Sequence, residues 1–215
     1  MGNLSILRGA LASAQVSAYT TGTITLPSAR TAFVPPTAFE SIATGTPGAG
    51  GGAAEIVFTS IPQTYEYLQV RIFLRTDNSS PLLRFRLNAD YGSQYSYARM
   101  MGFEGIFGQS YDAGTYDSGT DAEFNYQVAN NTSPNLIGTR VAIIDVYDYA
   151  NTSKFTGMRS VFGAHGSAAS TPGVTGINYS QYSETTAITS ITLRTGNGFA
   201  FDSDSYAALY GIKGS

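Results

Sequence analysis

One glycine-rich stretch of the chain has a spacing that could bind a nucleotide. Gly48, Gly50 and Ala53 have the G-x-G-x-x-A spacing of loops that wrap a dinucleotide pyrophosphate. Such a loop follows a strand and opens a helix, because the free N–H groups of the first helical turn bind the phosphate. Here the β-branched and aromatic run 54–59 follows the glycines and predicts a strand. We therefore interpret the stretch as a loop that enters a strand, with no nucleotide cofactor.

A nucleophilic triad would have to use the single histidine of the chain, His165. A Ser–His–Asp site holds its serine on a defined turn beside the histidine. His165 lies in the Gly/Ala/Ser-rich run 162–170, and no G-x-S-x-G motif occurs in the chain. The sequence therefore favours a loop or surface histidine and predicts no catalytic residue.

Carboxylates gather in two polar stretches. Two of them flanking a cleft could hydrolyse a glycosidic bond, and several oxygen ligands on one loop could hold Ca²⁺. The EF-hand spacing is absent, and glycine-rich acidic loops are usually solvated. We therefore expect no bound metal and no acid–base pair at these residues, which are Asp112, Asp117, Asp121, Glu123, Asp202 and Asp204.

Tyrosines cluster in the middle of the chain, and two interpretations of them stay open. Exposed rings could stack on the sugar rings of a glycan. Tyrosine also suits a half-buried sheet surface, where the ring packs and the hydroxyl stays wet, and this second interpretation is the favoured one. The possible ligand-facing aromatic residues are Tyr91, Tyr95, Tyr97, Tyr111 and Tyr116.

The composition excludes several classes of protein. The 215 residues contain no cysteine, which excludes disulfides and thiolate metal sites. Charged residues make up 13% and the net charge is −3, so the chain has no basic field for nucleic acid. No apolar stretch reaches the roughly 18 residues that a membrane-spanning helix needs. We expect a chain that is made in the cytoplasm and binds neither nucleic acid nor membrane.

Residues 1–37 differ from the rest and predict an N-terminal docking arm. A 3/4 spacing of leucines predicts a short amphipathic helix, and a proline-bounded extended segment follows it over 20–36. A disordered tail is the alternative, but the apolar content argues against full disorder. The assembly-anchor residues of this arm are Leu4, Leu7, Leu11, Ile24, Leu26 and Phe33.

Residues 38–215 show the period-two pattern of antiparallel sheets. In 67–76 and 82–88, apolar and polar side chains alternate, and 138–149 is apolar on both faces, as in a central strand. Runs 187–194 and 205–213 add two more strands, and further candidates occur at 94–101, 124–128 and 155–162. About ten strands with almost no helical pattern predict an all-β fold, an antiparallel, jelly-roll-like β-sandwich.

Five stretches of this body carry a resemblance to a known family. They are AAEIVFTSIPQTYEYLQVR, LLRFRLNADYGSQYSY, AIIDVYDYANTSKFTGMRS, AITSITLRTGNGF and SYAALYGIKGS. In content and order they resemble small virion proteins of tailed phages that infect aquatic bacteria, including cyanobacteria. The first 37 residues depart from the short N-termini of that family.

The resemblance implies a non-enzymatic virion surface protein without cofactors. We expect a capsid decoration or cement protein whose arm binds the major capsid protein or another virion protein, and which forms a homo-oligomer, a trimer. The alternative is a tail-fibre or receptor-binding module that recognises a host surface glycan through its tyrosines.

Overall fold

The structure is a computed structural model, and the chain divides into two units, Met1–Thr37 and Ala38–Ser215. All described residues belong to the second unit: 39–47, 55–75, 83–90, 92, 94–103, 106–115, 122–123, 140–164, 174–195 and 200–214. The predicted docking arm and its six anchor residues lie outside the described residues. The arm therefore stays a prediction.

The described residues form twelve strands and no helix, which confirms the predicted all-β class. All pairings between neighbouring strands are antiparallel. The strands are β1 (Phe39–Gly45), β2 (Glu55–Phe58), β3 (Tyr67–Leu74), β4 (Leu83–Leu87), β5 (Tyr95–Phe103), β6 (Ile106–Thr115), β7 (Ala122–Glu123), β8 (Arg140–Tyr147), β9 (Thr156–Ala164), β10 (Val174–Tyr182), β11 (Ile191–Thr195) and β12 (Tyr206–Ile212).

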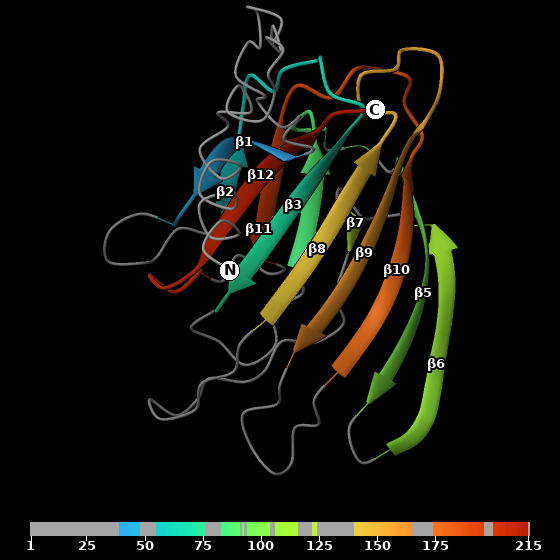
Figure 1. The fold of residues 1–215 in the computed structure, drawn as a ribbon. Helices are drawn as coiled ribbons and strands as arrows, with labels where there is room; N and C mark the ends of the chain where they lie inside the picture. Colours follow the sequence, from blue (N-terminus) through green and yellow to red (C-terminus); the bar gives the residue numbers. More distant parts are fainter. Residues whose placement is uncertain are drawn as a thin grey trace, which may run out of the picture. The chain divides into compact units, whose positions relative to one another are not determined.

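Two sheets build the sandwich (Figure 1). The larger has the order β1-β12-β3-β8-β9-β10-β5-β6, and the smaller has the order β2-β11-β4-β7. The first strand pairs with the last in the larger sheet, and the second pairs with the last but one in the smaller sheet. This concentric pairing of the two ends of the chain is the topology of a jelly roll.

Two hairpins are added to the jelly roll. Without them, the sheets would have the orders β1-β12-β3-β8 and β2-β11-β4-β7, four strands each. The hairpin β5–β6 leaves the chain between β4 and β7, and the hairpin β9–β10 leaves it between β8 and β11. Both join the larger sheet, because β9 pairs with β8 and β10 pairs with β5. One sheet is thereby twice as wide as the other.

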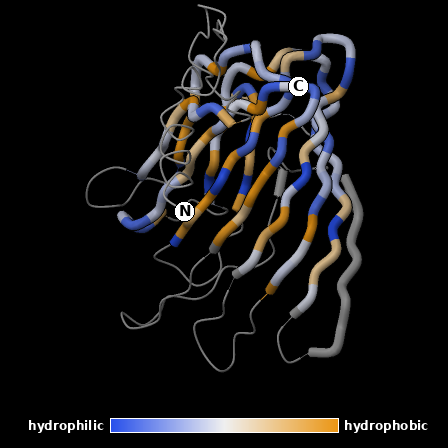
Figure 2. The backbone as a smooth tube through the Cα atoms, viewed as in Figure 1, coloured by the Kyte–Doolittle hydropathy of each residue, from blue (hydrophilic) through white to orange (hydrophobic). Residues whose placement is uncertain are grey.

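The alternation of side chains explains why these segments are strands. In β3, Leu68, Val70, Ile72 and Leu74 are buried, while the residues between them are partly or fully exposed. The same alternation is visible along neighbouring strands of the larger sheet in Figure 2. Apolar side chains of both sheets form one core, which contains all four of these residues and Phe85 of the smaller sheet. Full burial of each stabilises the fold by about 1.5 to 3 kcal/mol.

Two outcomes concern the predicted loops. The strand expected after the glycines is present as β2, whereas the glycines at 48–52 lie outside the described residues. The acidic stretch that starts at Tyr111 was expected to be a loop, and this is wrong for 111–115, which belong to β6. Pairing with β5 holds these residues in a strand, because neighbouring backbone hydrogen bonds outweigh their weak intrinsic β-propensity.

Candidate interaction surface

The outer face of the larger sheet, which points away from the smaller sheet, carries a row of exposed aliphatic side chains. Ile143 of β8 pairs with Val161 of β9, which pairs with Ile177 of β10, which pairs with Met100 of β5. Their exposed fractions are 46%, 50%, 46% and 45% in that order. We call these four residues the apolar row. Val141, two residues before Ile143 on the same face, is 51% exposed.

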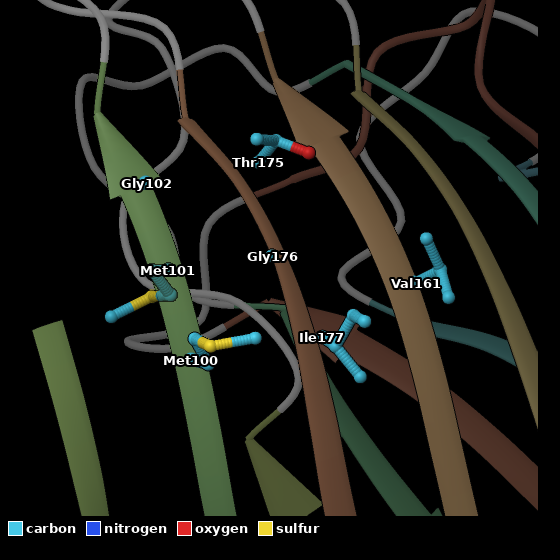
Figure 3. Close-up of a pocket in the computed structure, with 7 residues that line it drawn as sticks. All are labelled: Met100, Met101, Gly102, Val161, Thr175, Gly176 and Ile177. Carbon is cyan, nitrogen blue, oxygen red and sulfur yellow. The ribbon is translucent and has the colours of Figure 1, made fainter. Parts of the chain in front are cut away.

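A hollow of about 410 Å³ lies at one end of the apolar row (Figure 3). Met100 reaches from β5 toward Ile177 of β10, and both flank the hollow. The hollow forms because Gly102 presents no side chain on this face: a methyl group added there would find no atom within 4 Å. The lining residues are Met100, Met101, Gly102, Val161, Thr175, Gly176 and Ile177.

A polar network lies beside the apolar row, around Asp145 of β8. The Asp145 carboxylate is only 5% exposed although it lies on the outer face. Gln69 Nε2 donates a hydrogen bond to its Oδ1 over 2.8 Å, and the Tyr147 hydroxyl donates to its Oδ2 over 3.2 Å. Arg159 completes the network with an ion pair to the same Oδ2. The buried negative charge therefore has a donor from each of three strands.

This network changes the ionisation of its members. The hydrogen bond to Asp145 raises the pKa of the Arg159 guanidinium. Burial first, and the Asp145 charge second, raise the pKa of the Tyr147 hydroxyl. Both directions favour the protonated, hydrogen-bond-donating forms of Arg159 and Tyr147.

Arginines on the outer face lie against aromatic rings of the same face. The Arg71 guanidinium lies 4.8 Å from the ring centroid of Tyr210 and 5.1 Å from that of Phe39. Arg159 lies 5.8 Å from the ring centroid of Tyr147. Cation–π contacts of this kind hold a cation close to the sheet.

Of the five tyrosines that the sequence singled out, three belong to described strands, and Tyr111 pairs with Met100 at the end of the apolar row. Tyr95 was one of the possible ligand-facing residues, but it lies inside the fold: it is 1% exposed, its oxygen accepts a hydrogen bond from the Leu87 N–H, and its ring packs on Tyr182. Tyr97 is partly buried, with the Arg99 guanidinium 5.2 Å from its ring centroid. Tyr111 belongs to β6, and Tyr91 and Tyr116 lie outside the described residues.

The predicted carboxylates are dispersed. Asp202 and Asp204, in the loop before β12, both pair with Arg75 at the end of β3, at 3.7 and 3.0 Å. Asp112 lies in β6 and Glu123 in β7. Asp117, Asp121 and His165 lie outside the described residues. In the part of the chain that the structure describes, no three Asp, Glu, His or Cys side chains are placed to hold a metal ion.

The sequence contained a signal for the apolar row that was interpreted differently. The segment 138–149 is apolar on both faces, and this correctly indicated a strand in the middle of a sheet: β8 lies between β3 and β9. The inner residue Ile144 is fully buried, whereas Ile143 on the outer face is half exposed. The apolar residues on the second face of this strand thus belong to the exposed row.

Within the described ranges, no helix has the length and apolar character to cross a bilayer. No protein-family model, curated protein or solved structure matches this chain.

Proposed function

We propose that this chain is a non-enzymatic structural protein of a phage virion, a capsid decoration or cement protein that its N-terminal arm anchors to the shell. The observation that carries the proposal is the apolar row on the outer face of a jelly-roll sheet. Exposed aliphatic side chains that adjoin one another are typical of surfaces that other proteins cover. The resemblance of five stretches of the body to small phage virion proteins supports the same role.

The energetics of the apolar row explain why an arm is part of the proposal. With Val141, the half-exposed side chains offer on the order of 400 Å² of apolar surface. Its burial contributes about 10 kcal/mol at about 25 cal/mol per Å². Association costs about 4 to 15 kcal/mol in lost freedom of motion. Against a shell surface that offers no matching apolar row, the body alone therefore supports a weak contact, and the apolar residues of the arm would supply further binding energy.

A truncation tests the proposal. Deleting residues 1–37 should leave a folded body that no longer incorporates into particles. The measurement is the thermal melting of the purified protein together with its recovery in purified virions. Retention of the truncated protein on virions at the occupancy of the full chain would show that the body makes the attachment. Absence of the full chain from purified virions would overturn the proposal itself.

Aromatic rings on the outer face favour one alternative, a tail-fibre or receptor-binding module that binds a host glycan. Tyr206 is 48% exposed and stacks on Phe73 with ring centroids 5.4 Å apart, and Tyr179 is 50% exposed. Flat aromatic surfaces of this kind can stack on sugar rings. The copy number per virion separates the two roles: hundreds of copies support decoration, and a few copies support a fibre.

A further inference from the structure

We infer that the outer face of the larger sheet binds the same face of a second copy of this chain, around a two-fold axis that runs along the strands between β9 and β10. This inference deepens the proposed structural role and rests on it. It differs from the trimer expected from the sequence, because the apolar row is self-complementary about a two-fold axis. The dimer can be measured with the purified chain alone. A failure of this inference is therefore distinguishable from a failure of virion incorporation.

The strand register makes the apolar row self-complementary. A two-fold axis between β9 and β10 places β8 of one copy over β5 of the other, and β9 over β10. Rows of paired residues stay aligned, because the axis is parallel to the strands. Ile143 then faces Met100 of the second copy, and Val161 faces Ile177 of the second copy. Every member of the apolar row thus meets an aliphatic side chain.

The same operation places a protruding side chain over the hollow. Val141 of β8 lies in one row of the sheet with Gly163, Thr175 and Gly102. Val141 of one copy therefore faces Gly102 of the other, where the surface is open. Thr175 faces the glycine at position 163, which also lacks a side chain. Packed sheets interdigitate large side chains with small ones in this way.

The charges of the outer face suit this arrangement. In the next row, Arg159 of one copy faces the half-exposed ring of Tyr179 of the other, and Asp145 faces Ala98. No two like charges meet across the axis in these rows. A partner with an acidic surface would be attracted by Arg159, but it would bring its own charge against the apolar row, which holds no partner for it.

The available area is sufficient for a stable dimer. The axis pairs six strands of the larger sheet, from β3 to β6, and leaves β1 and β12 without an opposite strand. Six strands spaced about 4.8 Å apart, with about eight residues of about 3.3 Å each, span roughly 760 Å² on each copy. A standard interface buries about 800 Å² on each partner. The apolar row occupies the middle four of these six strands, and Arg71 of β3 and Tyr111 of β6 are the next residues at its two ends.

Sedimentation of the full chain tests the contact. The wild-type protein should sediment at micromolar concentration with twice the 22.7 kDa mass of one chain. Val161→Lys should raise the dissociation constant at least 100-fold, because it places a cation at the centre of the contact. Val57→Lys is the matched control: Val57 is equally exposed, at 50%, but lies in β2 of the smaller sheet, and the dimer should persist.

Gly102→Val tests the hollow separately. It fills open space in its own chain, so it should leave the melting temperature unchanged while it weakens the dimer about tenfold or more.

Cysteine cross-linking tests the axis, since the natural chain has no cysteine to react. A mixture of two single variants, Ile143→Cys and Met100→Cys, should form a covalent dimer with a short bismaleimide. Each variant alone should cross-link far less, because the two copies of either position are separated by three strand spacings, roughly 14 Å, in the plane of the sheet. A wild-type monomer, a trimer, a dimer that both lysine variants leave intact, or equal cross-linking of single and mixed variants would each overturn the inference.

Discussion

At the scale of single residues, the neighbours of Asp145 determine how far its carboxylate is buried. Its position in the sequence, between apolar neighbours on an exposed face, predicts a solvated carboxylate, yet the side chain is nearly buried. Gln69, Tyr147 and Arg159 surround it and offer it three donors. If a buried acceptor is removed, its donors lose their hydrogen-bond partner inside the protein. The free energy lost by leaving these donors unpaired is the main effect of such a substitution on stability.

Replacing this carboxylate should therefore be costly. We expect Asp145→Ala to lower the free energy of unfolding by about 1 to 3 kcal/mol, measured by urea denaturation. Lys154→Ala is the control: Lys154 is 65% exposed and lies 3.7 Å from the Asp148 carboxylate, and its removal should change stability by less than about 0.5 kcal/mol. If both variants lowered the free energy of unfolding equally, the burial of Asp145 would not explain the cost of removing it.

Tyr182 makes stability depend on alkaline pH. Its hydroxyl donates a 2.6 Å hydrogen bond to Asp90 Oδ2, and burial first and this bond second raise its pKa above the ordinary value. Because the folded-state pKa is the higher one, the stabilisation is complete below about pH 10, the value in the unfolded chain. This stabilisation is lost as the pH rises further, because the Tyr182 hydroxyl loses its proton at a lower pH in the unfolded chain than in the folded one.

Unfolding measured between about pH 8 and pH 11 should therefore show stability falling above about pH 10. Tyr182→Phe should be less stable than the wild type at pH 8, and should lose less stability over the same interval. Raised pKa values at Tyr65, Tyr147 and Tyr149 contribute to the wild-type decline and remain in the variant. Parallel curves for the two proteins would show that Tyr182 does not contribute to it.

At the scale of elements, two glycines in strands of the larger sheet have opposite roles. Gly211 of β12 lies under the Tyr65 ring, where an added Cβ would come within 2.3 Å of the ring. Gly102 of β5 faces open space. One glycine therefore permits close packing inside the fold, and the other leaves a hollow on its surface.

Gly211→Ala should accordingly destabilise the fold by about 1 to 3 kcal/mol, because the Tyr65 ring must move to admit a methyl group. Gly102→Ala provides the matched change at an open position in the same sheet, and the free energy of unfolding should change by less than about 0.5 kcal/mol. Urea denaturation of both variants checks the pair. Comparable losses would mean that the loss of glycine, rather than the ring above it, determines the cost.

The two added hairpins supply most of the apolar row. Val161 and Ile177 belong to the hairpin β9–β10, Met100 belongs to β5, and only Ile143 comes from a strand of the jelly roll itself. Because β10 pairs with β5 over nine residues, the two hairpins are joined firmly although they are far apart in the chain. The apolar row is thus a product of the added strands.

At the scale of the whole molecule, the division of the chain at Thr37 and Ala38 leads to a further prediction. Among the described residues, the core cluster extends from Ile56 to Leu209, and the chain divides into two units at Thr37 and Ala38. Residues 38–215 should therefore fold without the first 37. Far-UV circular dichroism of this fragment should show a β spectrum and a cooperative thermal transition. A helix content above about a quarter, or the loss of a cooperative transition, would contradict it.

The sequence by itself determined the class of the fold and several of its strands. Alternation along β3 separates a buried face from a wetter one, because successive side chains of a strand point to opposite sides. In β4 the apolar side chains are buried as predicted, but Arg86, expected on the wet face, is only 1% exposed. The strand β10 was missed, since buried Asn178 and Ser180 replace apolar residues on its inner face and break the pattern. The alternation of apolar and polar residues therefore identifies a strand only where the buried positions hold apolar residues.

Only the tertiary structure decided where the interaction surface lies. Ile143, Val161, Ile177 and Met100 are separated by up to 77 positions in the sequence, and each alone is an ordinary apolar residue of a strand. Strand order and register bring them into one row, and within the described part of the chain no second layer packs on this face, so that they are half exposed. Alternation tells which residues share a face of one strand. The pairing of strands that are distant in the sequence decides which strand faces form one sheet surface, and which of these surfaces stay exposed.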